Sequence, residues 1–153
     1  MLARLARWLR VLGFDTLYDP AVHDPQLVRI SNEEGRVLLT RDRHLLRELR
    51  PASALEIVHD APLDQLKQVV AATRLPAPAE LFTRCTVCNS MLSDPLLASD
   101  AELLVPQRVR SLHVPVRQCP TCLRVYWNGS HTRRMRAAIE RELPGWLAPQ
   151  ANE

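Results

Sequence analysis

Hydrophobic positions in the first half of the chain alternate between helical and strand spacing. A repeat of three to four residues predicts a helix that ends at Gly13, carried by Leu2, Leu5, Leu9 and Leu12. Short apolar runs predict strands at Asp15–Tyr18, Arg36–Thr40 and Leu55–Val58. Further helices are predicted to begin with a capping residue or proline at Asp24, Asp42 and Pro62. This order predicts an α/β domain with a parallel sheet and flanking helices.

The second half of the chain has a different pattern. Leu75–Pro78 contains two prolines and is predicted to link the first domain to a small module. That module is expected to contain strands at Val114–Arg117 and Arg124–Trp127, followed by a helix that Ser130 caps and Pro144 ends. The predicted divisions are an α/β domain at 1–78, the small module at 81–128, a basic helix at 129–143 and a tail at 144–153.

All four cysteines fall in two Cys-x-x-Cys pairs, Cys85 with Cys88 and Cys119 with Cys122, with thirty residues between the pairs. A gap of two residues lets both sulfurs of a pair face one ion, and two pairs complete a closed tetrahedral Zn²⁺ site. A closed site has no position for water, so the zinc is expected to be structural. The alternatives are a disulfide scaffold or redox Cys-x-x-Cys motifs, and the lack of a secretory signal favours zinc.

Composition excludes several classes of protein. Only four glycines are present, and no glycine-rich phosphate loop is found. No apolar run is long enough to span a membrane, and Arg4, Arg7 and Arg10 interrupt the N-terminal segment, so a signal peptide is not predicted. We therefore expect a cytoplasmic protein without membrane partners, in a reducing compartment that keeps thiols metal-bound.

Charge is uneven along the chain. Residues 84–141 hold nine arginines against four carboxylates, a balance of 9 − 4 = +5. Arginine is the usual bidentate phosphate ligand, so this half is expected to contact RNA, although a GC-rich genome would give the same bias. The predicted RNA-contacting residues are Arg41, His131, Arg133, Arg134 and Arg136. For His131 a surface turn is an equal alternative, and for Tyr126 and Trp127 a place in the module core competes with base stacking.

Three aspartates follow or precede the predicted elements of the first domain. Asp42 lies two residues after the strand that ends at Thr40, Asp19 follows the strand that ends at Tyr18, and Asp24 begins a helix. Ligands gather at the carboxyl ends of parallel strands, and carboxylates there could hold Mg²⁺ or Mn²⁺ for phosphodiester hydrolysis. Helix capping alone also accounts for Asp24 and Asp42.

Five segments in order carry a family resemblance: Leu5–Arg10, Gly13–Tyr18, Gly35–Asp42, Arg84–Asn89 and Arg124–His131. Together they resemble the Mut-seven C-terminal RNase family over about residues 1–137. The resemblance implies a PIN-like nuclease domain with an appended zinc ribbon, and a Mg²⁺- or Mn²⁺-dependent ribonuclease. It assigns the metal-binding role to Asp42 directly and to Asp24 less directly, with Asp19 in reserve.

The resemblance also implies a central strand ending in an Asp ahead of Met1, which this chain does not contain. Either the true start lies upstream, or the chain is a fragment, or this homologue has lost the strand. Because a metal site that loses one carboxylate binds its ion more weakly, we expect the 153-residue chain to have little or no nuclease activity. The alternative function is a non-catalytic RNA-binding or protein-interaction module.

Overall fold

The computed structural model describes residues 2–148. The chain divides into two compact units: Met1–Ala6 with Leu17–Pro76 form unit 1, and Arg7–Thr16 with Ala77–Glu153 form unit 2. The boundary between them falls inside α1 (Ala3–Val11), the predicted N-terminal helix. The predicted divisions at residues 78, 81, 128 and 143 stay predictions, and the predicted tail lies partly outside the described residues.

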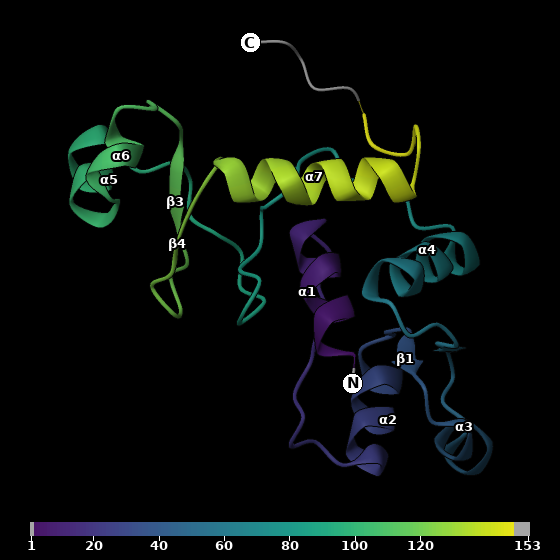
Figure 1. The fold of residues 1–153 in the computed structure, drawn as a ribbon. Coiled ribbons are helices and arrows are strands. Elements are labelled where there is room, and N and C mark those ends of the chain that lie inside the picture. The colour runs from purple at the N-terminus through teal and green to yellow at the C-terminus, as the bar shows by residue number, and fades with distance from the viewer. Residues whose placement is uncertain (1, 149–153) are drawn as a thin grey trace. The chain divides into compact units, whose positions relative to one another are not determined.

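Unit 1 contains a βαβ arrangement, as the alternating pattern predicts (Figure 1). Its elements are α2 (Asp24–Glu33), β1 (Leu38–Thr40), α3 (Arg43–Leu49), β2 (Ala54–Glu56) and α4 (Pro62–Thr73). β1 and β2 pair in parallel, with Leu38 opposite Ala54, so the predicted parallel sheet is present as two strands. Val28, Leu38 and Leu45 form a buried cluster that packs α2 and α3 against β1.

Unit 2 is built around a second, antiparallel pair of strands. Its elements after α1 are α5 (Ala98–Leu104), α6 (Gln107–Arg110), β3 (Val116–Gln118), β4 (Val125–Trp127) and α7 (Ser130–Glu142). β3 and β4 pair with Val116 opposite Trp127. The two short helices α5 and α6 were not predicted. Val105 and Val109 pack them onto the strand pair through a buried cluster with Val116.

Three local predictions are wrong. Asp15–Tyr18 forms no strand, because the Thr16 N–H donates to the Asn89 side chain at 3.0 Å instead of to a neighbouring strand. Asp24 is the first residue of α2 and not its cap, since His23 occupies the extended cap position. Ser130 likewise begins α7 after Gly129, and Thr132 Oγ1 accepts the Gly129 N–H at 2.9 Å.

The fold is thus mixed α/β with two small sheets. The PIN-like topology of unit 1 remains a prediction. None of the helices in residues 2–148 is long and apolar enough to cross a membrane.

Candidate functional site

The four cysteines of unit 2 converge as their spacing predicts. Their Sγ atoms all lie within 4.8 Å of one another. Contacts across the pairs are 3.5 Å between Cys85 and Cys122 and 3.4 Å between Cys88 and Cys119. A tetrahedral ion with Zn–S bonds of about 2.3 Å separates its sulfurs by about 3.8 Å. The cluster therefore has the size and the donor set to hold one zinc ion, and all four thiols are free of disulfides.

Two turns of the same backbone geometry present these sulfurs. In the first, the Asn89 N–H donates to the Cys85 carbonyl at 3.0 Å, and in the second the Leu123 N–H donates to the Cys119 carbonyl at 3.0 Å. Asn89 and Leu123 both adopt left-handed backbone conformations, with φ of 71° and 60°. In each turn the N–H of the second cysteine also points at the first sulfur, at 3.5 and 3.4 Å. The two turns form a matched pair of metal-binding knuckles.

The thiols of the cluster differ in how readily they ionise. Hydrogen bonding to Ser90 lowers the pKa of Cys88 to about 6. The Arg124 N–H favours ionisation of Cys122, but lost solvation and the other three cysteines outweigh it and raise the pKa of Cys122 to about 12. Several thiolates so close together repel one another unless a cation neutralises them. A zinc ion could supply that charge, and the four thiols fit it.

Tyr126 supports the cluster from β4. Its hydroxyl lies 3.0 Å from Cys85 Sγ and accepts the Thr86 N–H at 3.2 Å. Burial raises the pKa of Tyr126 to about 12, so the hydroxyl keeps its proton and donates it toward the sulfur. Tyr126 thus packs with the cysteine cluster. Of its two predicted roles, the structure shows the place in the module core.

A polar network ties the first knuckle to residues 7–16, and sequence reasoning missed it. Arg10 is only 6% exposed and donates to the Val87 carbonyl at 2.7 Å. Arg84 donates to the Gly13 carbonyl at 3.0 Å. Gly13 has φ of +84°, and a Cβ there would lie 2.7 Å from Thr83 Oγ1, so the network needs glycine at this position. Arg10, Gly13 and Arg84 all belong to segments that carry the family resemblance. That shared membership was the one feature of the sequence that could have indicated the network.

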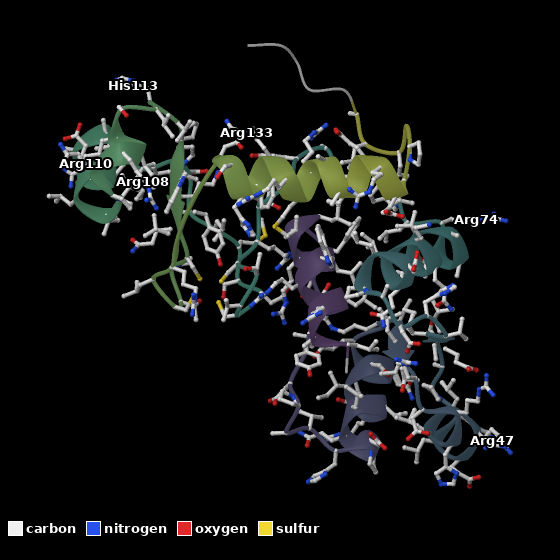
Figure 2. The ribbon with its side chains drawn as sticks, in the orientation of Figure 1. Arg47, Arg74, Arg108, Arg110, His113 and Arg133 are labelled. Atoms are coloured by element: carbon white, nitrogen blue, oxygen red, sulfur yellow. The ribbon has the colours of Figure 1, made fainter. Side chains whose placement is uncertain are left out.

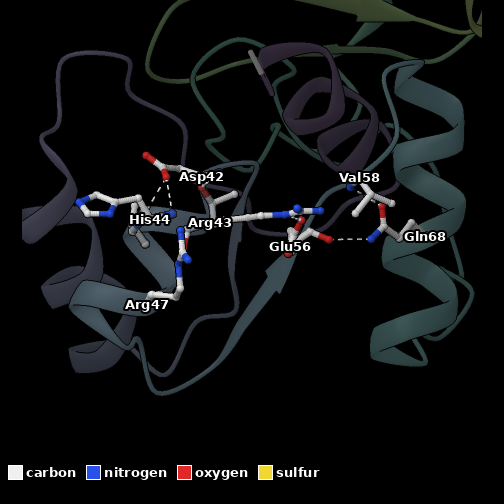
Figure 3. A network of polar contacts seen from close by, with 9 residues as sticks. Asp42, Arg43, His44, Arg47, Glu56, Val58 and Gln68 are labelled. Atoms are coloured by element: carbon white, nitrogen blue, oxygen red, sulfur yellow. Dashed lines mark hydrogen bonds and ion pairs between the residues drawn. The ribbon is translucent and has the colours of Figure 1, made fainter.

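In unit 1, Asp42 lies where β1 ends and caps α3, as predicted. Its Oδ1 accepts the N–H groups of His44 at 2.7 Å and Leu45 at 3.2 Å (Figure 3). An open depression of about 550 Å³ is lined by Arg41, Asp42, Arg43 and His44. The exposed carboxylate therefore lies at the carboxyl end of a parallel strand beside two arginines that are each paired with another carboxylate, Arg41 with Asp60 and Arg43 with Glu56, both at 2.6 Å.

The other predicted acidic residues do not join Asp42 in a compact cluster. Asp19 Oδ1 accepts the Ala21 N–H at 2.9 Å, and Asp24 is exposed at the start of α2. Within residues 2–148, the four cysteines are the only group of three or more acidic, histidine or cysteine ligands close enough for a metal ion. Any ion at Asp42 would therefore draw its remaining ligands from water, RNA or a rearranged segment.

The predicted RNA-contacting residues differ in whether their side chains already form ion pairs with carboxylates. Arg41 pairs with Asp60 at 2.6 Å, and Arg136 pairs with Glu140 at 2.8 Å. His131, Arg133 and Arg134 are exposed on the first turns of α7. Free guanidinium groups are the better phosphate ligands, so the start of α7 suits RNA more than Arg136 does.

Comparison with known proteins gives one match. The family model of the Mut7-C RNAse domain matches residues 1–139, which cover both units and all four cysteines. The chain belongs to the Mut7-C RNAse domain family. Membership suggests a nuclease-like role. Because the match runs from residue 1 to residue 139, the cysteine cluster and Asp42 both lie within the family domain. No curated protein and no solved structure matches the chain.

Proposed function

We propose that this Mut7-C domain hydrolyses RNA phosphodiester bonds with a Mg²⁺ or Mn²⁺ ion bound at Asp42, while zinc on the four cysteines is structural. The observation that carries the proposal is the position of Asp42 at the end of β1, beside Arg41, Arg43 and His44, in a chain of an RNase family. A bound divalent ion would polarise a phosphate and lower the pKa of a bound water.

Each side chain has a proposed task. The Asp42 oxygen that makes no capping bond would face the ion, with Asp24 approaching from the start of α2 and Asp19 in reserve. Arg41 would bind a phosphate oxygen and give up its exposed pair with Asp60, because a surface ion pair contributes less than about 1 kcal/mol. His131, Arg133, Arg134 and Arg136 would bind phosphates elsewhere on the strand of RNA.

A second candidate function rests on the same geometry. Asp42 Oδ1 already accepts two backbone N–H groups, and the three aspartates do not form a compact ligand cluster. A non-catalytic RNA-binding module needs neither a free carboxylate nor a second metal. Such a module would bind RNA through its arginines and leave it intact.

Cleavage of a labelled single-stranded RNA, with and without added Mn²⁺ or Mg²⁺, separates the two functions. In a chain extended ahead of Met1 by the strand ending in Asp that the family resemblance implies, we expect metal-dependent products that disappear in Asp42→Asn, which removes the charge that the ion needs. The 153-residue chain itself is expected to cleave little or not at all. Asp100→Asn, an exposed carboxylate of α5 in unit 2, is the matched control and should cleave like the wild type. Binding without cleavage by the extended chain at any metal concentration would instead establish the binding module.

The N-terminal strand that the family resemblance implies is tested in the same assay. A chain extended ahead of Met1 by a strand ending in Asp should cleave faster than the 153-residue chain, because it adds a carboxylate ligand. Equal rates would show that this carboxylate contributes nothing to the reaction.

A further inference from the structure

Unit 2 contains a long stretch without negative charge. From Leu103 to Ile139 the chain holds seven arginines, two histidines and no Asp or Glu. Two of these arginines pair with carboxylates outside the stretch, Arg117 with Glu80 at 2.9 Å and Arg136 with Glu140 at 2.8 Å. The other five arginines form no ion pair with any residue that the structure describes. The stretch is therefore a source of uncompensated positive charge.

Arg108 and Arg110 project from α6 because of how that helix packs. Val109, between them, is 5% exposed and belongs to the cluster with Val105 and Val116. Burial of Val109 leaves the residues on either side of it exposed. Within residues 2–148 neither arginine forms an ion pair, and Arg110 makes only a long contact of 3.4 Å from Nε to the Val105 carbonyl.

Strand register brings α6 and the start of α7 to the same end of the β3–β4 pair. Val116, the first residue of β3, lies opposite Trp127, the last residue of β4. α6 ends shortly before β3, and α7 begins shortly after β4. Val109 and Trp127 belong to one packed cluster, which confirms that α6 covers this end of the strand pair. The cysteine knuckle that joins Gln118 to Val125 lies at the opposite end.

Figure 2 shows Arg108, Arg110 and His113 on α6 and the turn after it, and Arg133 near the start of α7. We infer that these four residues form one RNA-backbone-binding surface, named here the α6 surface, at the end of the strand pair away from the cysteines. This inference rests on the proposed function for the identity of the partner. It adds Arg108, Arg110 and His113 to the predicted RNA contacts.

RNA fits the α6 surface better than an anionic membrane does. Separate guanidinium groups on two elements match a chain of phosphates, each bound bidentately. Among the exposed leucines of this region, Leu112 lies between Arg110 and His113, whereas Leu97, Leu103 and Leu104 lie at α5, where Asp100 and Glu102 are also exposed. An anionic lipid surface that met the leucines of α5 would also meet those carboxylates, and one leucine at α6 is a small apolar area for lipid insertion.

The test measures binding of a labelled single-stranded RNA by Arg108→Ala/Arg110→Ala over a series of salt concentrations. No Mg²⁺, Mn²⁺ or chelator is added, so neither cleavage nor zinc removal affects the result. Two lost phosphate contacts should lower the slope of log affinity against log salt by about 1.4, at about 0.7 for each contact. The double variant Arg29→Ala/Arg74→Ala is the control, since it removes the same charge from exposed positions of unit 1.

The inference is overturned if the α6 double variant keeps the wild-type slope and affinity, or if the control double variant loses as much. It is also overturned if the wild type binds phosphatidylserine vesicles, the α6 double variant does not, and neither binds RNA. Zinc content and melting temperature of both variants should equal those of the wild type. Loss of RNA cleavage in Asp42→Asn with intact α6-dependent binding would leave this surface standing, so the two proposals fail separately.

Discussion

Asn89 holds Asp15 through a hydrogen bond of 2.6 Å from Nδ2 to Oδ1, across seventy-four positions of sequence. The same carboxamide accepts the Thr16 N–H at 3.0 Å through its Oδ1. Asn89 also has the left-handed conformation that ends the first cysteine knuckle. One buried side chain therefore connects the metal centre to the segment that follows α1.

We predict opposite effects of glycine at the two equivalent knuckle positions. Asn89→Gly keeps the left-handed backbone but loses two hydrogen bonds in a site that is 8% exposed, so it should destabilise unit 2 by about 1–3 kcal/mol. Leu123→Gly removes the strain of a side chain at φ of 60° that is 65% exposed, and should stabilise by about 1 kcal/mol.

Urea unfolding of the zinc-loaded proteins measures both effects. Because the two variants introduce the same residue at matched positions, opposite signs would show that the side-chain bonds of Asn89 contribute more to stability than the left-handed backbone costs. Equal destabilisation by both variants would contradict the role given to Asn89.

Tyr126→Phe should weaken zinc retention without unfolding unit 2. The change removes only the hydroxyl that lies 3.0 Å from Cys85 Sγ, and loss of such a supporting bond lowers metal affinity by about 10–100-fold. Competition with a coloured zinc chelator gives the affinity. Tyr18→Phe, at an exposed position of unit 1, is the control and should retain zinc like the wild type. Unchanged retention in Tyr126→Phe would show that the hydroxyl does not support the metal.

Zinc content is expected to be one ion per chain and to decrease as the pH is lowered. Cys88, with a pKa of about 6, is already a thiolate near neutral pH, whereas Cys122, with a pKa of about 12, must lose its proton when zinc binds. Affinity should therefore fall about tenfold per pH unit for each displaced proton, and more steeply once Cys88 also protonates below its pKa.

Metal analysis of purified protein and chelator competition between mildly acidic and neutral pH measure these quantities. Cys85→Ser should lose the zinc and destabilise unit 2. Zinc retained in Cys85→Ser, or linked cysteines under reducing conditions, would refute the four-thiolate site.

The sequence predicted the features that depend on local spacing. Two Cys-x-x-Cys pairs supply one tetrahedral donor set wherever the intervening thirty residues go, so the cluster was predictable. β1 and β2 follow from continuous apolar runs joined by a helix. The capping role of Asp42 needs only the residues next to it.

Features that depend on distant partners were not predictable in this way. Asp15–Tyr18 has strand-like composition, but its Thr16 N–H is satisfied by Asn89, and no spacing rule shows that bond. α5 and α6 were missed because they are short and become stable by packing on β3 and β4. The positions of Asp19 and Asp24 relative to Asp42 likewise depend on tertiary structure.

Asp42 is expected to have two separable roles, in stability and in catalysis. Asp42→Ala removes the oxygen that accepts the N–H groups of His44 and Leu45, and should destabilise unit 1 by about 1 kcal/mol. Asp42→Asn keeps a side-chain oxygen in the capping position, so it should unfold close to the wild type. Made in the chain extended ahead of Met1, both variants should lose metal-dependent RNA cleavage, because neither carries the negative charge. Thermal melts and the cleavage assay on the same preparations test this. A cleaving Asp42→Asn protein would remove Asp42 from the reaction and leave it as a helix cap, whereas equal destabilisation of both variants would show that the charge, and not the capping bond, stabilises α3.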